Sequence, residues 1–189
     1  MTTSQLASDL WVFGYGSLMW RPGFEFVEAR PALLRGWHRS FCLYSLHYRG
    51  TPDQPGLVLG LDRGGSCRGV AFRVAAARAA LTVEYLNERE LVGYAYMAKT
   101  LAVCLEDGRR VPAYGFIADR RHRHYAGEME MGRAAAIIMD AQGCAGLNRD
   151  YLINTVRRLE ADGFVDKSLH ALLLEVERQT GLIEQGAGI

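Results

Sequence analysis

The sequence predicts an α+β fold within a single domain. Short apolar runs separated by glycine-containing turns fill the first half of the chain, which is typical of strands. An alanine-rich helical segment and two further strands follow, and the C-terminal third has helical periodicity. This order of elements favours α+β over alternating parallel units. The 189 residues, 49% of them hydrophobic, can bury one core, and we expect a flexible tail at 1–9 and one domain at 10–189.

Glycines and turn residues set the boundaries of the expected elements. The stretch 62–65 predicts a hairpin turn, and Gly108 belongs to a second turn. Gly143, Gly163 and Gly181 are expected to end the three C-terminal helices. The expected strands cover 11–15, 29–36, 39–45, 57–61, 68–74, 95–105 and 110–117, and the expected helices cover 76–89, 129–141, 150–161 and 167–180.

Composition narrows the classes of partner. A net charge of +1 argues against nucleic acid as the main partner. No apolar run approaches the roughly 20 residues that span a bilayer, so we expect no membrane insertion. Widely spaced cysteines without a secretory signal indicate reduced thiols in the cytoplasm, each expected to be buried as a small apolar residue. They are Cys42, Cys67, Cys104 and Cys144.

The segment 11–20, Trp-Val-Phe-Gly-Tyr-Gly-Ser-Leu-Met-Trp, is the most informative part of the chain. An apolar strand runs into Gly14 and Gly16, and glycines two residues apart let the backbone turn sharply and approach a ligand. Successive N–H groups in such a turn bind carboxylates or a developing oxyanion. A dinucleotide-binding loop does not fit, because Met19 replaces its third glycine and Arg-Pro-Gly at 21–23 prevents the helix that should follow. An ordinary strand turn remains the alternative.

The segment 13–18 resembles the glycine loop of the gamma-glutamylcyclotransferases. Four further segments, in family order, resemble the ChaC-type, glutathione-specific branch of that family. The resemblance implies a small closed or nearly closed mixed β-barrel with helices packed around it, and an enzyme that needs no cofactor, metal or nucleotide. The four segments cover 49–56, 65–73, Arg89-Glu90 with Gly93-Tyr94, and 148–152.

The reaction implied by the resemblance is an intramolecular cyclisation of glutathione. The γ-glutamyl α-amine attacks its own side-chain amide carbonyl, the ring closes to 5-oxoproline, and cysteinylglycine leaves as an amine. One carboxyl group can serve first as the base and then as the acid. Because the attack is intramolecular, correct folding of the bound substrate supplies much of the rate.

Glu90 is the catalytic candidate because it occupies the position of the family's catalytic glutamate. Near the C-terminal end of the expected helix, burial and the helix dipole would raise the pKa of a carboxyl group, as a base working near neutral pH requires. Taken by itself, the residue also fits a solvated surface glutamate. Glu88 is the second candidate, and it points about 200° away from Glu90 as long as the helix continues.

The expected substrate-binding set combines the glycine loop with two residues elsewhere. Backbone N–H groups of the loop would hold the glutamyl carboxylate or the oxyanion, and the hydroxyls of Tyr15 and Ser17 are further candidates. A core aromatic at Tyr15 and a turn hydroxyl bonded to its own backbone at Ser17 are the alternatives. Arg49 suits a carboxylate but equally a structural turn, and Tyr151 resembles a tyrosine placed over the substrate but equally a core aromatic. The full set is Val12, Phe13, Gly14, Tyr15, Gly16, Ser17, Leu18, Arg49 and Tyr151.

Metal and covalent catalysis are not expected. His122 and His124 are spaced like residues on one face of a strand, but the basic run 120–124 repels a cation and no acidic residue continues the alternation. A solvated loop is expected there instead. Ser17 lacks the nucleophile elbow, and no cysteine has a histidine near it in the sequence.

The chain departs from the family pattern at two places. The loop 143–147 is more apolar than the family's, and His47-Tyr48 is bulkier. Both differences could reshape the pocket for cysteinylglycine. They leave the reaction class intact and bear on the substrate, so a cyclotransferase for other γ-glutamyl amino acids or amines stays open. A non-enzymatic regulator that binds a small molecule is a separate alternative, and it would not need a carboxyl group at Glu90.

Overall fold

The computed structural model describes residues 8–91 and 95–181, which divide into two compact units. We call Met1–Arg39 with Gly60–Asp119 the barrel unit, and Ser40–Leu59 with Arg120–Ile189 the helical unit. The expected tail at 1–9 falls largely on 1–7, which lie outside the described residues. The single domain expected over 10–189 stays a prediction.

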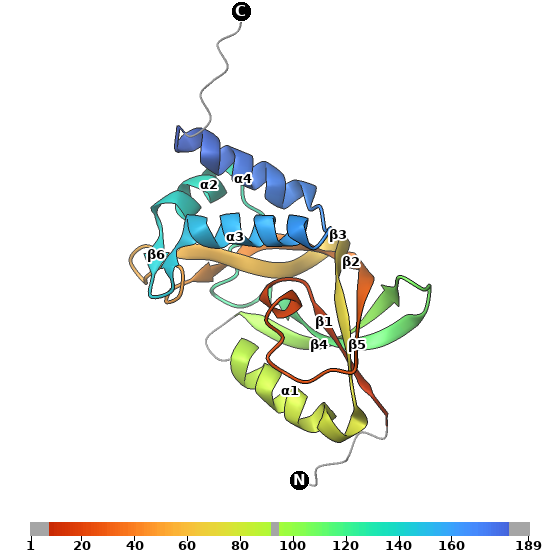
Figure 1. The fold of residues 1–189 in the computed structure, drawn as a ribbon. Coiled ribbons are helices and arrows are strands. Elements are labelled where there is room, and N and C mark those ends of the chain that lie inside the picture. Colours follow the sequence, from red (N-terminus) through yellow and green to blue (C-terminus); the bar gives the residue numbers. More distant parts are fainter. Residues whose placement is uncertain (1–7, 92–94, 182–189) are drawn as a thin grey trace, which may run out of the picture. The chain divides into compact units, whose positions relative to one another are not determined.

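The five long strands close into a barrel in the order β1-β3-β2-β4-β5 (Figure 1). β1 is antiparallel to β3 and parallel to β5, so the barrel is mixed. This confirms the α+β class and the barrel implied by the resemblance. The strands are β1 (Leu10–Gly14), β2 (Glu28–Ser45), β3 (Gly56–Val74), β4 (Tyr96–Leu105) and β5 (Arg110–Ala118).

Two strands are much longer than the sequence predicted. The expected strands 29–36 and 39–45 form one strand, β2, which passes through Gly36 at a φ of 80°. The hairpin turn expected at 62–65 is wrong, because β3 continues through it with Gly64 at a φ of 100° and Gly65 at 63°. Glycines in the left-handed region bend a strand without ending it, as in a β-bulge.

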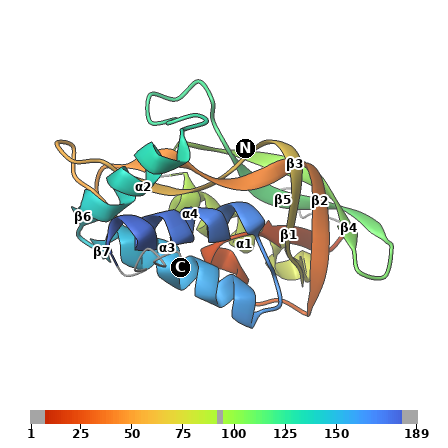
Figure 2. The same ribbon diagram turned by 90° about the horizontal axis from the view of Figure 1, so that it is seen from above.

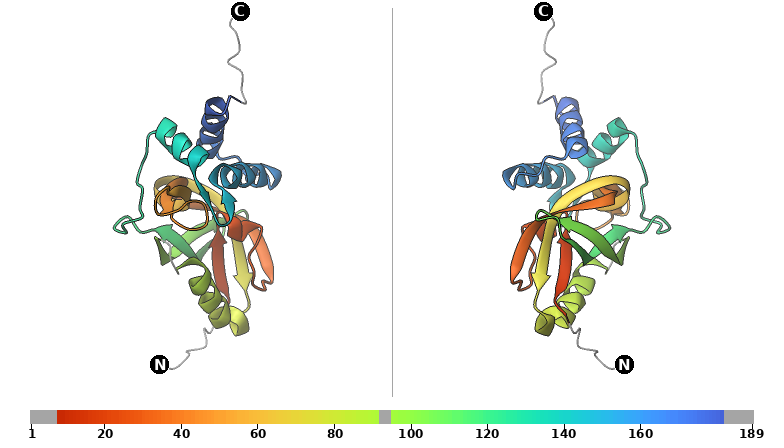
Figure 3. Two further views of the ribbon diagram at one scale, coloured as in Figure 1. Left: turned by 90° about the vertical axis from the view of Figure 1, so that its left-hand side faces the viewer. Right: turned by 90° about the vertical axis from the view of Figure 1, so that its right-hand side faces the viewer.

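The helix α1 (Ala76–Glu90) runs beside the barrel strands (Figure 3), and a core cluster of the barrel unit forms between them. Ala79, Thr82 and Leu86 are buried, and their spacing puts them on one face of the helix. Leu86 packs into a cluster from three strands and the segment after β1. Its other buried members are Val12, Leu18, Phe72, Val74 and Phe116.

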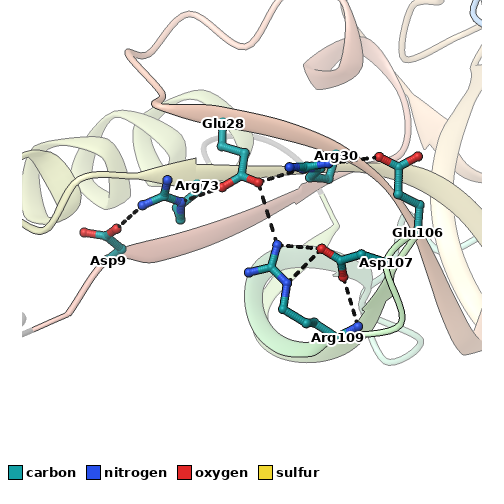
Figure 4. A network of polar contacts seen from close by, with 7 residues as sticks. All are labelled: Asp9, Glu28, Arg30, Arg73, Glu106, Asp107 and Arg109. Atoms are coloured by element: carbon teal, nitrogen blue, oxygen red, sulfur yellow. Dashed lines mark hydrogen bonds and ion pairs between the residues drawn. The ribbon is translucent and has the colours of Figure 1, made fainter.

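An ion-pair network joins the strands of the barrel unit (Figure 4). Glu28 is its centre, with one carboxylate oxygen 2.6 Å from Arg30 Nε and the other 2.8 Å from Arg73 Nε. Arg73 also lies 2.7 Å from a carboxylate oxygen of Asp9. These guanidinium groups lower the pKa of the Glu28 and Asp9 carboxyls. The remaining members are Glu106, Asp107 and Arg109.

We expect Glu28→Gln to lower the Tm modestly at pH 7 and low salt. Because the folded-state pKa of Glu28 lies below its ordinary 4.5, its stabilisation is complete above that pH and is lost as the pH falls through the lowered value. The Tm difference should therefore close at low pH and shrink in high salt. Glu25→Gln is the control, since Glu25 forms an exposed pair with Arg78. Equal Tm values for the two variants at pH 7 would contradict the expectation.

The helical unit contains α2 (Met131–Asp140), α3 (Asn148–Ala161) and α4 (Lys167–Gln179), which pack against one another (Figure 2). Gly163 and Gly181 follow α3 and α4 at φ values of 78° and 72°, which confirms the expected stops. The stop expected at Gly143 is wrong. α2 already ends at Asp140, and the following residues form a small hairpin of β6 (Gln142–Gly143) and β7 (Gly146–Leu147).

Among the described residues, no helix is both long enough and apolar enough to cross a membrane.

Candidate functional site

The glycine loop leaves β1 at Gly14 and turns into a single 3-10 turn, η1 (Ser17–Met19). A Cβ on Gly14 would lie 3.1 Å from Leu18 Cβ, so glycine at this position lets the turn pack closely on the strand, and a side chain would push Leu18 away. Gly16 has a φ of −137° and is outside the left-handed region. The sequence did not predict the helical turn, because it is only three residues long.

A buried arginine forms hydrogen bonds with the backbone of this loop and of β3. Arg39 is 3% exposed, and its guanidinium donates to the carbonyls of Tyr15 and Arg68. The Tyr15 carbonyl and the Gly16 N–H belong to one planar trans peptide and point in opposite directions. The bond to Arg39 therefore directs the Gly16 N–H away from Arg39. Burial of a charge requires such partners, and nothing in the sequence linked Arg39 to the loop.

The predicted loop residues differ in what they can offer a ligand. Val12 and Phe13 are fully buried, and Leu18 is a core residue beside them. Tyr15 is also buried, whereas Ser17 is half-buried and bonded to a guanidinium. Gly14 and Gly16 are buried as well, so Ser17 is the residue of this segment that solvent reaches most easily.

Glu90 is the last residue of α1, one residue beyond the expected end of the helix. Its side chain is 18% exposed, and one carboxylate oxygen lies 3.1 Å from Arg89 Nε. Burial raises the pKa of Glu90, and the positive charge of Arg89 opposes part of this effect. Glu88 is exposed, so the helix separates the two candidates as its geometry predicts. The motif residues Gly93 and Tyr94 lie outside the described residues.

Arg89 brings Glu90 and the glycine loop together within the barrel unit. Its Nη2 lies 3.1 Å from Ser17 Oγ, and its Nη1 lies 2.6 Å from the Arg21 carbonyl oxygen. From the sequence, Arg89 is identified only as a neighbour of Glu90 in the same motif. An arginine in the last turn of a helix beside a candidate base was the available signal, because cations are favoured at helix C-termini.

Arg49 and Tyr151 lie together in the helical unit. Arg49 Nη1 donates to the carbonyl oxygens of Ala145 and Leu147 at 2.7 and 3.2 Å. The guanidinium carbon stands 5.2 Å from the centroid of the Tyr151 ring, which also packs edge-on against Phe41. Through these contacts Arg49 holds the β6–β7 hairpin, a structural role other than the turn at 49–52 that the sequence suggested, and its expected role in substrate binding stays a prediction.

Asn148, for which the sequence indicates no role, is a structural residue. It is fully buried, and its side-chain amide forms two hydrogen bonds with the backbone of Leu57, at 2.7 Å to the N–H and 2.8 Å to the carbonyl. The first residue of α3 thus ties this helix to the beginning of β3.

We expect Asn148→Ala to lower the free energy of unfolding by about 2 kcal/mol, because it leaves the N–H and the carbonyl of Leu57 buried without their partner. Urea denaturation measures the change. Asn154→Ala is the matched control, since Asn154 is an exposed residue of the same helix. A loss no greater than that of the control would show that water or another group replaces the amide.

The expectation that every cysteine is buried is wrong for two of the four. Cys42 and Cys67 are buried, but Cys104 is half-buried and Cys144 is exposed. The Cys144 sulfur lies 3.3 Å from Nε2 of His47, a partner distant in the sequence. The β6–β7 hairpin brings them together, because the Cys144 N–H donates to the His47 carbonyl oxygen at 2.9 Å.

The histidine pair lies in a loop, as expected. The rings of His122 and His124 are edge-on with centroids 4.9 Å apart, and His122 Nδ1 accepts the backbone N–H of His124. Across residues 8–91 and 95–181, no three His, Cys, Asp or Glu side chains gather in an arrangement that could hold a metal ion.

Comparison with known proteins gives consistent matches. The family model described as ChaC-like protein matches residues 10–179. A glutathione-specific gamma-glutamylcyclotransferase of Escherichia coli is 39% identical over 169 residues, covering 89% of this chain and 73% of that protein. The Schizosaccharomyces pombe protein of that name is 31% identical over 198 residues, covering 94% and 96%.

A solved structure shares the fold. The crystal structure of a yeast gamma-glutamyl cyclotransferase specific to glutathione matches with a TM-score of 0.81 at 24% identity, covering 90% of this chain and 96% of that one.

Proposed function

Because this chain belongs to the ChaC-like family, we propose that it is a gamma-glutamylcyclotransferase that cleaves glutathione to 5-oxoproline and cysteinylglycine. The observation that supports this most directly is the Glu90 carboxyl, largely buried at a helix end and linked through Arg89 to the glycine loop. A binding module has no need of a carboxyl group whose pKa is raised by burial.

In the proposed mechanism Glu90 moves one proton between two nitrogens. The substrate's α-amine begins as an ammonium group, and the Glu90 carboxylate removes a proton from it. The free amine then attacks the γ-carbonyl carbon, and the oxygen takes the negative charge. As the C–N bond to cysteinylglycine breaks, protonated Glu90 returns the proton to the leaving nitrogen. The ring nitrogen still carries two hydrogens and a positive charge after the attack, and it releases its second proton to water or to the departing amine, which gives the neutral lactam. A raised pKa suits both steps, because the group must hold and release a proton near neutral pH.

The glycine loop provides the complementary electrostatic contribution. Backbone N–H groups from Gly14 to Leu18 would receive the glutamyl carboxylate or the oxyanion. Arg39 and Arg89 already hold this segment through the Tyr15 carbonyl and the Ser17 hydroxyl, so its donors need little rearrangement during the reaction. For Arg49 and Tyr151 a role in substrate binding rests on the resemblance, beside the structural contacts that they make.

A cyclotransferase for other γ-glutamyl amino acids or amines is the second candidate. The same chemistry would serve a different leaving group. This candidate is worth testing because the sequence departs from the family pattern at exposed side chains, which could contact a different leaving group. They are His47, Tyr48 and Cys144.

The test is a panel of γ-glutamyl compounds that includes glutathione, with 5-oxoproline as the measured product. We expect the highest kcat/KM with glutathione and turnover in the presence of EDTA, because the mechanism uses no metal. Faster release of 5-oxoproline from another member of the panel would favour the second candidate. Binding of glutathione without any 5-oxoproline would contradict both and support a regulator.

A further inference from the structure

The Arg89 side chain is the point where three parts of the barrel unit meet. Its Nε lies 3.1 Å from a carboxylate oxygen of Glu90, and its Nη2 lies 3.1 Å from Ser17 Oγ in η1. Its Nη1 lies 2.6 and 3.2 Å from the carbonyl oxygens of Arg21 and Pro22, and 3.1 Å from the Tyr85 hydroxyl. One guanidinium thus contacts the proposed base, the turn after the glycine loop, and its own helix.

Only an arginine can make this set of contacts. The guanidinium carries five donors in a rigid plane, so one group can face a carboxylate on one edge and carbonyl and hydroxyl oxygens on another. A lysine ammonium would keep the charge, but its single nitrogen cannot span all of these oxygens.

We infer that Arg89 is a positioning residue for catalysis, which holds the Glu90 carboxylate in a fixed relation to the glycine loop. This inference rests on the proposed function, since it takes Glu90 as the base and the loop as the substrate cradle. A misplacement of about 1 Å between reacting groups can lower a rate by about 10²-fold, so a shared anchor has a large effect.

Arg89 also influences when Glu90 is charged. Burial raises the pKa of Glu90 and the guanidinium lowers it, so removal of the positive charge should raise the pKa further. Among the described residues, Arg89 is the charged group found in contact with this carboxyl. The other groups that this guanidinium contacts are neutral. They are the carbonyls of Arg21 and Pro22 and the hydroxyls of Ser17 and Tyr85.

Two substitutions separate the charge from the geometry. In R89Q the charge and the contact geometry are both lost, and we expect kcat/KM for glutathione to fall by about 10²-fold. The acid limb of the profile of kcat/KM against pH should move to higher pH, because the pKa of Glu90 rises. In R89K the charge remains, so the acid limb should stay near its parental position while kcat still falls. R78Q is the matched control, because Arg78 lies on the same helix in an exposed pair with Glu25. Each protein is assayed for kcat and KM across pH 5 to 9, with its Tm measured alongside.

The outcomes distinguish this inference from the proposed function. Parental kinetics in R89Q, in a chain that is active and is inactivated by E90Q, would overturn the inference alone. A lower Tm and kcat with an unmoved acid limb in R89Q would reduce Arg89 to a structural residue. If R89Q does not fold, parental kcat in R89K would overturn the inference. If the parent protein does not turn over glutathione or any γ-glutamyl compound, the proposed function fails and this inference fails with it.

Discussion

In Glu90→Gln, turnover of glutathione should fall by about 10²-fold or more while glutathione still binds. The amide fills the volume of the carboxyl group and can still accept a hydrogen bond from Arg89 Nε, so the contact recorded at 3.1 Å need not be lost. It cannot take a proton from the α-amine or return one to the leaving nitrogen. Steady-state kinetics measure the loss, and calorimetry with glutathione measures the binding.

The same variant should keep its stability. Burial raises the folded-state pKa of Glu90 above its ordinary 4.5, so at neutral pH the charged form is less favourable in the folded chain than in the unfolded one. The amide removes this unfavourable contribution, and the Tm at pH 7 should equal or exceed that of the parent. In the parent, kcat/KM should fall as the pH drops through the raised pKa, because protonated Glu90 cannot act as the base.

Glu88→Gln is the control for this experiment. Glu88 lies on the same helix two residues earlier and is exposed, so its loss should leave turnover within a few-fold of the parent. If Glu90→Gln stays active and Glu88→Gln does not, Glu88 is the base and the assignment of Glu90 is wrong.

The sequence predicted the helices better than the strands, for a physical reason. The helix over 76–89 has no glycine or proline and is observed as Ala76–Glu90. Gly64 and Gly65 suit a hairpin turn and a strand bend equally well, because both need positive φ, and only pairing across the sheet decides between them. Closure of the barrel depends on the pairing of β1 with β3 and β5, which leaves no local pattern.

The sequence indicates a candidate site residue where a single side chain would carry the chemistry. It does not indicate residues whose role depends on contacts with distant parts of the chain. Glu90 was identified from its place in a motif, and its burial is what the structure adds. The roles of Arg39 and Arg89 in supporting the loop were not predicted, because the sequence does not show whether an arginine lies in solvent or binds distant carbonyls. For Arg89, its place in the last helical turn beside Glu90 was the available signal. For Arg49 the structure supplies partners in Ala145 and Leu147 that the sequence could not name.

The second large effect is expected at the glycine loop, where Gly16→Val should reduce turnover far more than stability. Gly16 precedes η1, and its carbonyl accepts the Met19 N–H at 2.9 Å. Its φ of −137° is outside the left-handed region, so φ does not exclude a side chain, but Gly16 is buried and the added side chain should also lower the Tm to a smaller extent. A valine there would cover the neighbouring N–H groups that we assign to the substrate. Gly14→Ala provides a contrast, because the new Cβ would lie 3.1 Å from Leu18 Cβ. We expect this variant to lower the Tm more than it lowers turnover.

Thermal midpoint and glutathione turnover are measured on the same preparation of each variant. A near-parental Tm with a loss of about 10²-fold in kcat/KM for Gly16→Val would support the loop as the cradle of the developing oxyanion, in line with the loss of a single oxyanion donor in other enzymes. Near-parental turnover would mean that the loop does not touch the reacting group. The oxyanion would then need other donors, and Arg89 could position Glu90 without also positioning the substrate's binding surface.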